Sequence, residues 1–347
     1  MNKKVLVAPL DWGLGHATRC IPVIRELIQQ NFQVILGTTA ITGEILSAEF
    51  PYLETIELIP YNIQYSEVWP VWWTVLTDYK RLTELTRYEQ EKMKELIKQH
   101  KIEIIVSDNR YGCFSNETKN VFITHQLKIK SPLFENKANH IISEQLKPFD
   151  EIWIPDNEDK EDNLSGELSH AKSEDLKVKY LGALSRFSDS SSDEGKEFDV
   201  CFLLSGAEPK RTQFESECIN YINSTNKKIA IVRGTKNKLS ESIRNNNCIV
   251  KDFPGTKELH ELITSSKKVV CRSGYSSIMD LALLNTPAYF IPTPGQTEQE
   301  YLANYLDGKF GFKKISSVKE IENFNDTEHH SKFINQIKLK EVISSLA

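Results

Sequence analysis

The chain has 347 residues, of which 39% are hydrophobic and 26% charged, a composition typical of a globular protein with more than one hydrophobic core. Its formal net charge of -5 gives no general attraction for nucleic acid, so we expect no nucleic-acid partner. The six cysteines are scattered without a Cys-x-x-Cys pair, which argues against both a disulfide framework and a structural zinc site.

No stretch approaches the ~20 consecutive apolar residues that a membrane-spanning helix needs. The apolar run at residues 5–8 is too short for a signal peptide, and Pro9 and Asp11 interrupt it. We therefore expect a cytoplasmic protein.

The first elements in the chain are a strand, a loop, a helix and a second strand. Residues 5–8 form a short apolar run of the kind that a parallel sheet buries on both faces. Apolar side chains at helical spacing follow, and residues 33–37 are the next strand. This βαβ beginning predicts a parallel sheet with right-handed crossovers.

The loop between the first strand and the first helix contains Gly13, Gly15 and His16. Glycines permit a tight turn and a close approach of ligand, and a helix N-terminus attracts anions. His16 stands where a general base or a phosphate-binding donor would be placed, and Arg19 adds a permanent cation one turn later. The alternative is a structural turn in which His16 caps the helix.

A charged amphipathic helix is expected over residues 78–101, followed by strands at 103–108, 121–124 and 151–155. Asp108 and His125 stand at the ends of the first two strands, where functional groups of open parallel sheets gather. We take them, with Arg110, as candidates for the acceptor side of a site. The alternative is that they form ordinary ion pairs and caps.

An aromatic stretch precedes that helix and contains Trp69, Trp72 and Trp73. These side chains could belong to the core, line a groove for an acceptor, or make a peripheral contact with the inner face of a membrane. We favour core or acceptor lining over membrane contact.

A second α/β run begins after a serine-rich acidic stretch at residues 188–196. Its strands are expected at 199–204, 228–232, 248–250, 269–271 and 288–291. We therefore predict two doubly wound Rossmann-like domains facing a cleft, at residues 1–180 and 181–347, with the C-terminal helix able to pack back on the first domain.

Three loops of the second domain carry candidate ligand-binding groups. Ser205 and Gly206 follow its first strand, where backbone N–H groups commonly contact phosphate. Residues 272–280 join a strand to a hydroxyl-rich helix start, with Asp280 placed to accept from ribose hydroxyls. The candidates in this segment are Arg272, Ser273, Gly274, Ser276, Ser277 and Asp280. Glu298 and Gln299 open the next helix and could bind sugar hydroxyls.

The segment from Arg272 to Leu306 resembles the nucleotide-sugar-binding signature of the GT-B glycosyltransferase family that includes the peptidoglycan lipid II N-acetylglucosaminyltransferase. The family's N-terminal glycine loop ends in Gly-His, as Gly15-His16 does here. By the same resemblance, Arg186 would contact phosphate and Phe253 would lie beside the nucleotide base.

The resemblance implies sugar transfer from a nucleotide sugar, with UDP as the expected nucleotide and His16 as the leading base. The acceptor stays open among a glycan, a lipid-linked molecule and a small molecule. No Asp-x-Asp motif occurs, so we expect fixed positive groups rather than a metal or another cofactor to stabilise the leaving group. The alternatives are a nucleotide-sugar hydrolase, a 2-epimerase using Asp108, or a non-catalytic nucleotide-sugar-binding protein.

Overall fold

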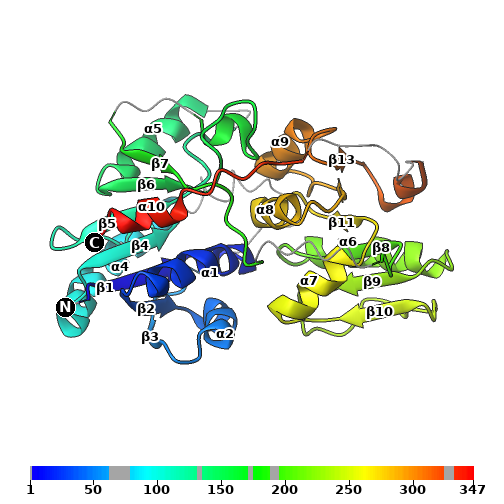
Figure 1. Ribbon diagram of the computed structural model, residues 1–347, viewed down its shortest axis with the longest axis horizontal. Helices are drawn as coiled ribbons and strands as arrows, with labels where there is room; N and C mark the ends of the chain where they lie inside the picture. The colour runs from blue at the N-terminus through cyan, green and yellow to red at the C-terminus, as the bar shows by residue number, and fades with distance from the viewer. Residues whose placement is uncertain (1, 62–78, 131–134, 171–174, 188–194, 324–331) are drawn as a thin grey trace. The chain divides into compact units, whose positions relative to one another are not determined.

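The computed structural model describes residues 2–61, 79–130, 135–170, 175–187, 195–323 and 332–347 (Figure 1). The chain divides into two compact units. The first contains the described residues up to Arg186 together with Asn335–Ala347, and the second contains those between Phe187 and Ile334. Part of the predicted serine-rich linker, residues 188–194, lies outside the described residues.

The first unit is built on a seven-stranded parallel sheet with the order β3-β2-β1-β4-β5-β6-β7. Its central strands β1 and β4 lie side by side, with Val5 opposite Ile104 and Pro9 opposite Asp108. The strands span Lys4–Pro9 (β1), Gln33–Thr38 (β2), Glu54–Glu57 (β3), Ile104–Asp108 (β4), Lys119–Ile123 (β5), Glu151–Ile154 (β6) and Val178–Tyr180 (β7). Val5, Leu6 and Val7 are fully buried, as expected for a strand covered on both faces.

Helices connect these strands, as the alternating apolar pattern predicts. They are α1 (Leu14–Gln29), α2 (Ala40–Glu49), α4 (Tyr79–His100), α5 (Glu135–Leu146) and the C-terminal α10 (Leu339–Ser344), with a 3₁₀ turn η1 at Gly166–Leu168. The apolar stripe of α1 faces the sheet, where Ile21, Ile24 and Leu27 are fully buried. The C-terminal α10 contacts α1, and Ser344 donates a hydrogen bond to Gln30 at 3.0 Å.

The second unit has a six-stranded parallel sheet with the order β10-β9-β8-β11-β12-β13. Its strands are β8 (Val200–Leu203), β9 (Ile229–Val232), β10 (Cys248–Lys251), β11 (Val269–Cys271), β12 (Ala288–Phe290) and β13 (Phe312–Lys314). Its helices are α6 (Lys210–Asn223), α7 (Thr256–Thr264), α8 (Tyr275–Leu283) and α9 (Thr297–Tyr305), with a 3₁₀ turn η2 at Val318–Asn323.

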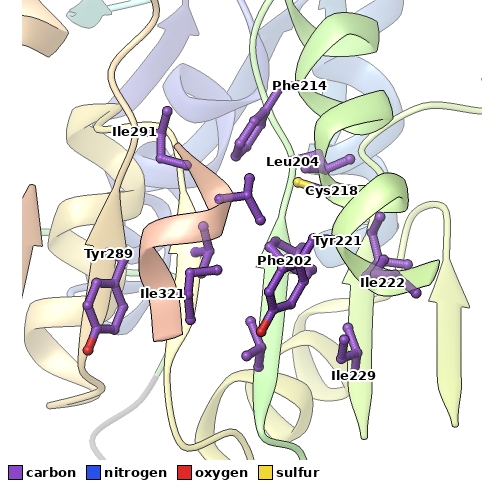
Figure 2. Close-up of a cluster of buried hydrophobic side chains, with 14 of the residues drawn as sticks. Phe202, Leu204, Phe214, Cys218, Tyr221, Ile222, Ile229, Tyr289, Ile291 and Ile321 are labelled. Atoms are coloured by element: carbon purple, nitrogen blue, oxygen red, sulfur yellow. The ribbon is translucent and has the colours of Figure 1, made fainter. Parts of the chain in front are cut away.

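One core of the second unit lies between its sheet, α6 and η2 (Figure 2). Phe202 and Ile229 enter it from the strands, Phe214 from α6, and Ile321 from η2. All four side chains are buried to 1% exposure or less. This packing fixes α6 against β8 and so sets the position of the loop that joins them.

In each sheet the strand order reverses at one place, between β1 and β4 in the first unit and between β8 and β11 in the second. Ligands of open parallel sheets bind outside the carboxyl ends of the strands at such switch points. His16, Asp108, Gly206 and Arg272 all lie at these strand ends or within a few residues after them.

Candidate functional site

At the switch point of the first unit, four side chains from three strand ends come together. His16 and Arg19 lie in the first turns of α1, Asp108 is the last residue of β4, and His125 follows β5. His16 Nδ1 is 3.1 Å from Asp108 Oδ1. Arg19 donates from Nε to Asp108 Oδ2 at 2.6 Å and from Nη2 to Asp108 Oδ1. The sequence-predicted His16, Asp108 and His125 thus belong to one cluster.

The cluster is buried at Asp108 and Arg19 and partly exposed at His16. The Asp108 side chain is fully buried and that of Arg19 is 2% exposed, whereas His16 keeps 15% of its side chain exposed. Burial raises the pKa of Asp108, but Arg19 and His16 outweigh burial and hold it well below the usual range. Burial, followed by the Arg19 charge, lowers the pKa of His16 from 6.5. Near neutral pH, His16 is therefore a neutral imidazole beside a carboxylate.

His16 is not the cap of α1. The N-cap residue is Gly13, at φ 97°, and no side chain makes a capping hydrogen bond there. The Nδ1 atom of His16 instead faces Asp108 on β4. Gly13 is needed for its left-handed backbone, which turns the chain into the helix, while Gly15 already lies within α1.

His125 joins the cluster through Arg19, whose Nη1 lies 3.2 Å from His125 Nδ1. Because a guanidinium only donates, this ring nitrogen of His125 accepts. Arg19 is therefore the hub of the cluster, a role that the sequence signals only through its position three residues after His16, on the same helix face.

A second buried ion pair supports the loop before α1. Arg110 is fully buried and donates from Nε to Glu89 Oε1 at 2.7 Å, and its Nη1 lies 3.8 Å from Asp11 Oδ1. The Asp11 carboxylate also accepts from the backbone N–H of Tyr61 at 3.1 Å. Asn109 lies between Asp108 and Arg110 in the sequence and has a φ of 57°. This backbone conformation directs the side chains of Asp108 and Arg110 to different partners, Arg19 and Glu89. Arg110 thus holds the loop that leads to His16.

In the second unit, two helices begin at the switch point, and their N-termini differ. At α6, the Glu208 carboxylate accepts from Thr212 N–H at 3.2 Å and from Arg211 Nε at 2.6 Å. The chain's own acid therefore caps this helix. At α8, the N-cap residue is Gly274, which has no side chain to cap the helix, and the first turn contains no acidic residue. The positive end of the α8 dipole is thus the better placed of the two to attract phosphate.

Several predicted nucleotide-site residues hold the loop after β12 against the start of α8. Arg272 Nη1 donates to the carbonyl oxygens of Ile291 and Pro292 at 3.0 and 3.1 Å. Ser273 Oγ donates to the Gln299 carbonyl at 2.8 Å, and Gln299 Oε1 accepts from Thr293 N–H at 2.9 Å. Arg272, Ser273 and Gln299 therefore shape the backbone of this edge.

The other predicted nucleotide-site residues of the second unit lie in α8, in α9 and after β10. Ser276 and Ser277 are partly exposed in the first turn of α8, and Asp280 lies one turn further on with 6% exposure. Glu298 is partly exposed in α9. Phe253, after β10, is 45% exposed, with Lys236 Nζ 5.8 Å from its ring centroid.

The remaining predicted residues lie in loops of their units. Gly206 has φ 106° beside the partly exposed Ser205, and an added Cβ there would meet no atom within 4 Å. The carbonyl oxygen of Arg186 accepts from Arg25 Nη1 at 2.8 Å in the first unit. Trp69, Trp72 and Trp73 lie outside the described residues.

In the part of the chain that the structure describes, no helix is long and apolar enough to cross a bilayer. No group of three or more His, Cys, Asp or Glu side chains there is arranged to hold a metal ion.

Comparison with known proteins found one family model and several solved structures that are similar to this chain. Residues 206–323 match the glycosyltransferase family 28 C-terminal domain. A search of curated protein sequences gave no match. Among solved structures, a calicheamicin glycosyltransferase superposes with a TM-score of 0.63 at 10% identity, over 99% of this chain and 93% of that one.

Two further structures superpose over nearly the whole chain. A spinosyn rhamnosyltransferase has a TM-score of 0.62 at 9% identity, covering 99% of this chain and 91% of that one. MurG of Acinetobacter baumannii has a TM-score of 0.52 at 11% identity, covering 99% and 90%. The two parallel sheets and the family 28 segment agree with the resemblance found in the sequence. The chain therefore has the GT-B fold, and its residues 206–323 are similar to the glycosyltransferase family 28 C-terminal domain.

Proposed function

We propose that this protein transfers a sugar from a UDP-sugar to an acceptor hydroxyl, with His16 as the general base. The observation that carries the proposal is the His16–Asp108 contact of 3.1 Å at a sheet switch point. When the Nδ1–H of a neutral imidazole donates a hydrogen bond to a buried carboxylate, the lone pair of Nε2 can accept a proton. Because 15% of the His16 side chain is exposed, a ligand can reach the ring, whereas the Asp108 carboxylate is shielded from water.

The second unit would hold the donor. The α8 N-terminus and its serines suit a diphosphate, because the positive end of the helix dipole favours negative charge and the serine hydroxyls can donate hydrogen bonds. Arg186 would add positive charge as the diphosphate leaves. A solved complex of the spinosyn rhamnosyltransferase with thymidine diphosphate supports a nucleotide diphosphate as ligand, and the sequence resemblance favours UDP.

The burial of Asp108 bears on the alternatives. An epimerase would need a second acid or base near the sugar, yet Asp108 is fully buried and bound by Arg19 through both oxygens. The carboxylate is therefore suited to orient His16 rather than to reach a sugar carbon. A hydrolase would use the same base on water, so only products separate that activity from transfer.

The decisive experiment is incubation of the protein with a panel of UDP- and TDP-sugars, with and without acceptors from the glycan, lipid-linked and small-molecule classes. Transfer predicts a glycosylated acceptor and free UDP. Free sugar as the only product would identify a hydrolase, and an epimerised donor would identify an epimerase. Binding of UDP without any product from any donor would leave a nucleotide-sugar-binding protein.

Asp280→Ala is expected to weaken the affinity for UDP by about 1–3 kcal/mol, because a carboxylate that accepts from ribose hydroxyls forms charge-assisted hydrogen bonds. Isothermal titration calorimetry with UDP measures this loss directly. The matched control is Glu261→Ala on helix α7, where the carboxylate is 62% exposed and lies 4.0 Å from Lys257 Nζ. Equal affinities of the folded Asp280 variant and the wild type would remove Asp280 from ribose binding.

A further inference from the structure

The side chain that connects His16 to the rest of its cluster is Arg19. Its guanidinium holds the Asp108 carboxylate by both oxygens, Nε on Oδ2 at 2.6 Å and Nη2 on Oδ1. This two-point geometry is specific to arginine, since the single ammonium of a lysine cannot reproduce the planar fork. The carboxylate is fully buried and is thereby locked in one orientation.

The environment of His16 Nδ1 contains two groups of opposite character. Asp108 Oδ1, at 3.1 Å, can only accept, whereas Arg19 Nη2, at 2.8 Å, can only donate. One ring nitrogen cannot satisfy both. The conflict is resolved when Nδ1–H and Nη2–H both donate to Oδ1, because a carboxylate oxygen has two lone pairs. The competing arrangement, in which Nδ1 accepts the second hydrogen of Nη2 at 2.8 Å, places the ring proton on Nε2.

We propose that Arg19 is the positioning residue for His16, since by fixing Asp108 through both oxygens it places the ring proton of His16 on Nδ1. This inference rests on the proposed function for its importance, because only the Nδ1–H tautomer leaves the Nε2 lone pair for an acceptor hydroxyl. The location of the proton is itself a property of the unliganded protein.

The same residue also controls the charge of the ring. The groups facing His16 are Arg19 on its own helix, Asp108 at the end of β4 and His125 after β5. Burial lowers the pKa of His16, the Arg19 charge and, to a lesser extent, His125 lower it further, and Asp108 raises it. Cys20 Sγ lies 3.6 Å from Asp108 Oδ2 and completes the ring of contacts around the carboxylate.

The test is ¹⁵N NMR of the full chain labelled at its eight histidines, with the His16 signals assigned by their loss in His16→Asn. In the wild type near neutral pH, we expect the shifts of His16 to show a protonated Nδ1 and an unprotonated Nε2. In Arg19→Lys the positive charge is kept but the fork is lost, so the Nε2–H tautomer is expected to gain population. In Arg19→Gln the charge is lost as well, so the His16 titration is expected to move to higher pH.

Arg25→Lys is the matched control on the same helix, because Arg25 pairs with Glu49 at 3.0 Å and has no contact with Asp108 among those the structure describes. Its His16 spectrum should equal that of the wild type. A wild-type His16 in the Nε2–H form overturns the inference, and that measurement needs no Arg19 variant to fold. An unchanged tautomer in Arg19→Lys overturns it too. Since no substrate is present, a failure to transfer sugar would refute the proposed function without changing the NMR result.

Discussion

Replacing His16 by asparagine is expected to lower turnover by about 10²–10⁴-fold, which is the usual contribution of a general base. Donor affinity should stay at the wild-type value, because the proposed nucleotide-binding groups other than Arg186 lie in the other unit and a base acts in the transition state. Asparagine keeps a polar group beside Asp108 but cannot take up the proton. Steady-state kinetics with the active UDP-sugar, together with calorimetric UDP binding, measure both quantities.

The pH dependence of the wild type gives an independent check on the same residue. Because burial and Arg19 lower the pKa of His16 from 6.5, the imidazole stays neutral to below that pH. Activity is therefore expected to be retained just below pH 6.5 and to be lost only as the pH falls through the lowered pKa. His16→Ala and His16→Asn should both fold, since His16 does not cap α1. Near-normal turnover in His16→Asn would end the general-base assignment.

The largest expected effect on stability comes from Glu89→Gln. The Glu89 carboxylate is 2% exposed and accepts from Arg110 Nε and from the Tyr61 hydroxyl, each at 2.7 Å. Losing its charge leaves the fully buried Arg110 guanidinium with Asp11 at 3.8 Å as its remaining ion-pair partner among the described contacts. Removing one partner of a buried ion pair costs about 3–5 kcal/mol. We expect a loss of that size in the free energy of unfolding of the first unit.

Denaturant unfolding followed by tryptophan fluorescence measures this loss, since Trp12 and Trp153 both belong to the first unit. The matched control is Glu91→Gln on the same helix α4, where the carboxylate is 62% exposed and lies 3.8 Å from Arg87. That change should cost less than about 0.5 kcal/mol, the value of an exposed helical pair. Similar midpoints for the two variants would contradict a structural role for the buried pair.

Most of the fold could be predicted from the sequence because its central strands are short apolar runs. The runs at residues 5–8 and 269–271 became the buried strands β1 and β11, and residues 78–101 became α4. The three strands without a prediction, β3, β7 and β13, are all edge strands. An edge strand is covered less completely, so residues such as those of Glu54–Glu57 show no apolar run.

The loops that contain the nucleotide-binding candidates could also be located, because glycines and hydroxyls between a strand and a helix are typical of a strand-to-helix turn. The roles of these candidates could not be predicted. Arg272 and Gln299 bind backbone groups of the loop after β12, and Glu208 caps α6 with its own carboxylate. Whether a side chain forms its hydrogen bonds within the protein or presents them to a ligand depends on the distances between strand ends. These strand ends are far apart in the sequence.

The sequence by itself determined that the chain forms two parallel α/β units and that His16 stands at the start of a helix, because apolar periodicity and glycine placement are local properties. Only the tertiary structure decided what His16 contacts. Asp108 is 92 residues away, and the pairing of β1 with β4 brings the two ends together. Arg19 then fixes the carboxylate. Burial strengthens the electrostatic interactions between these charges because little water is present to screen them.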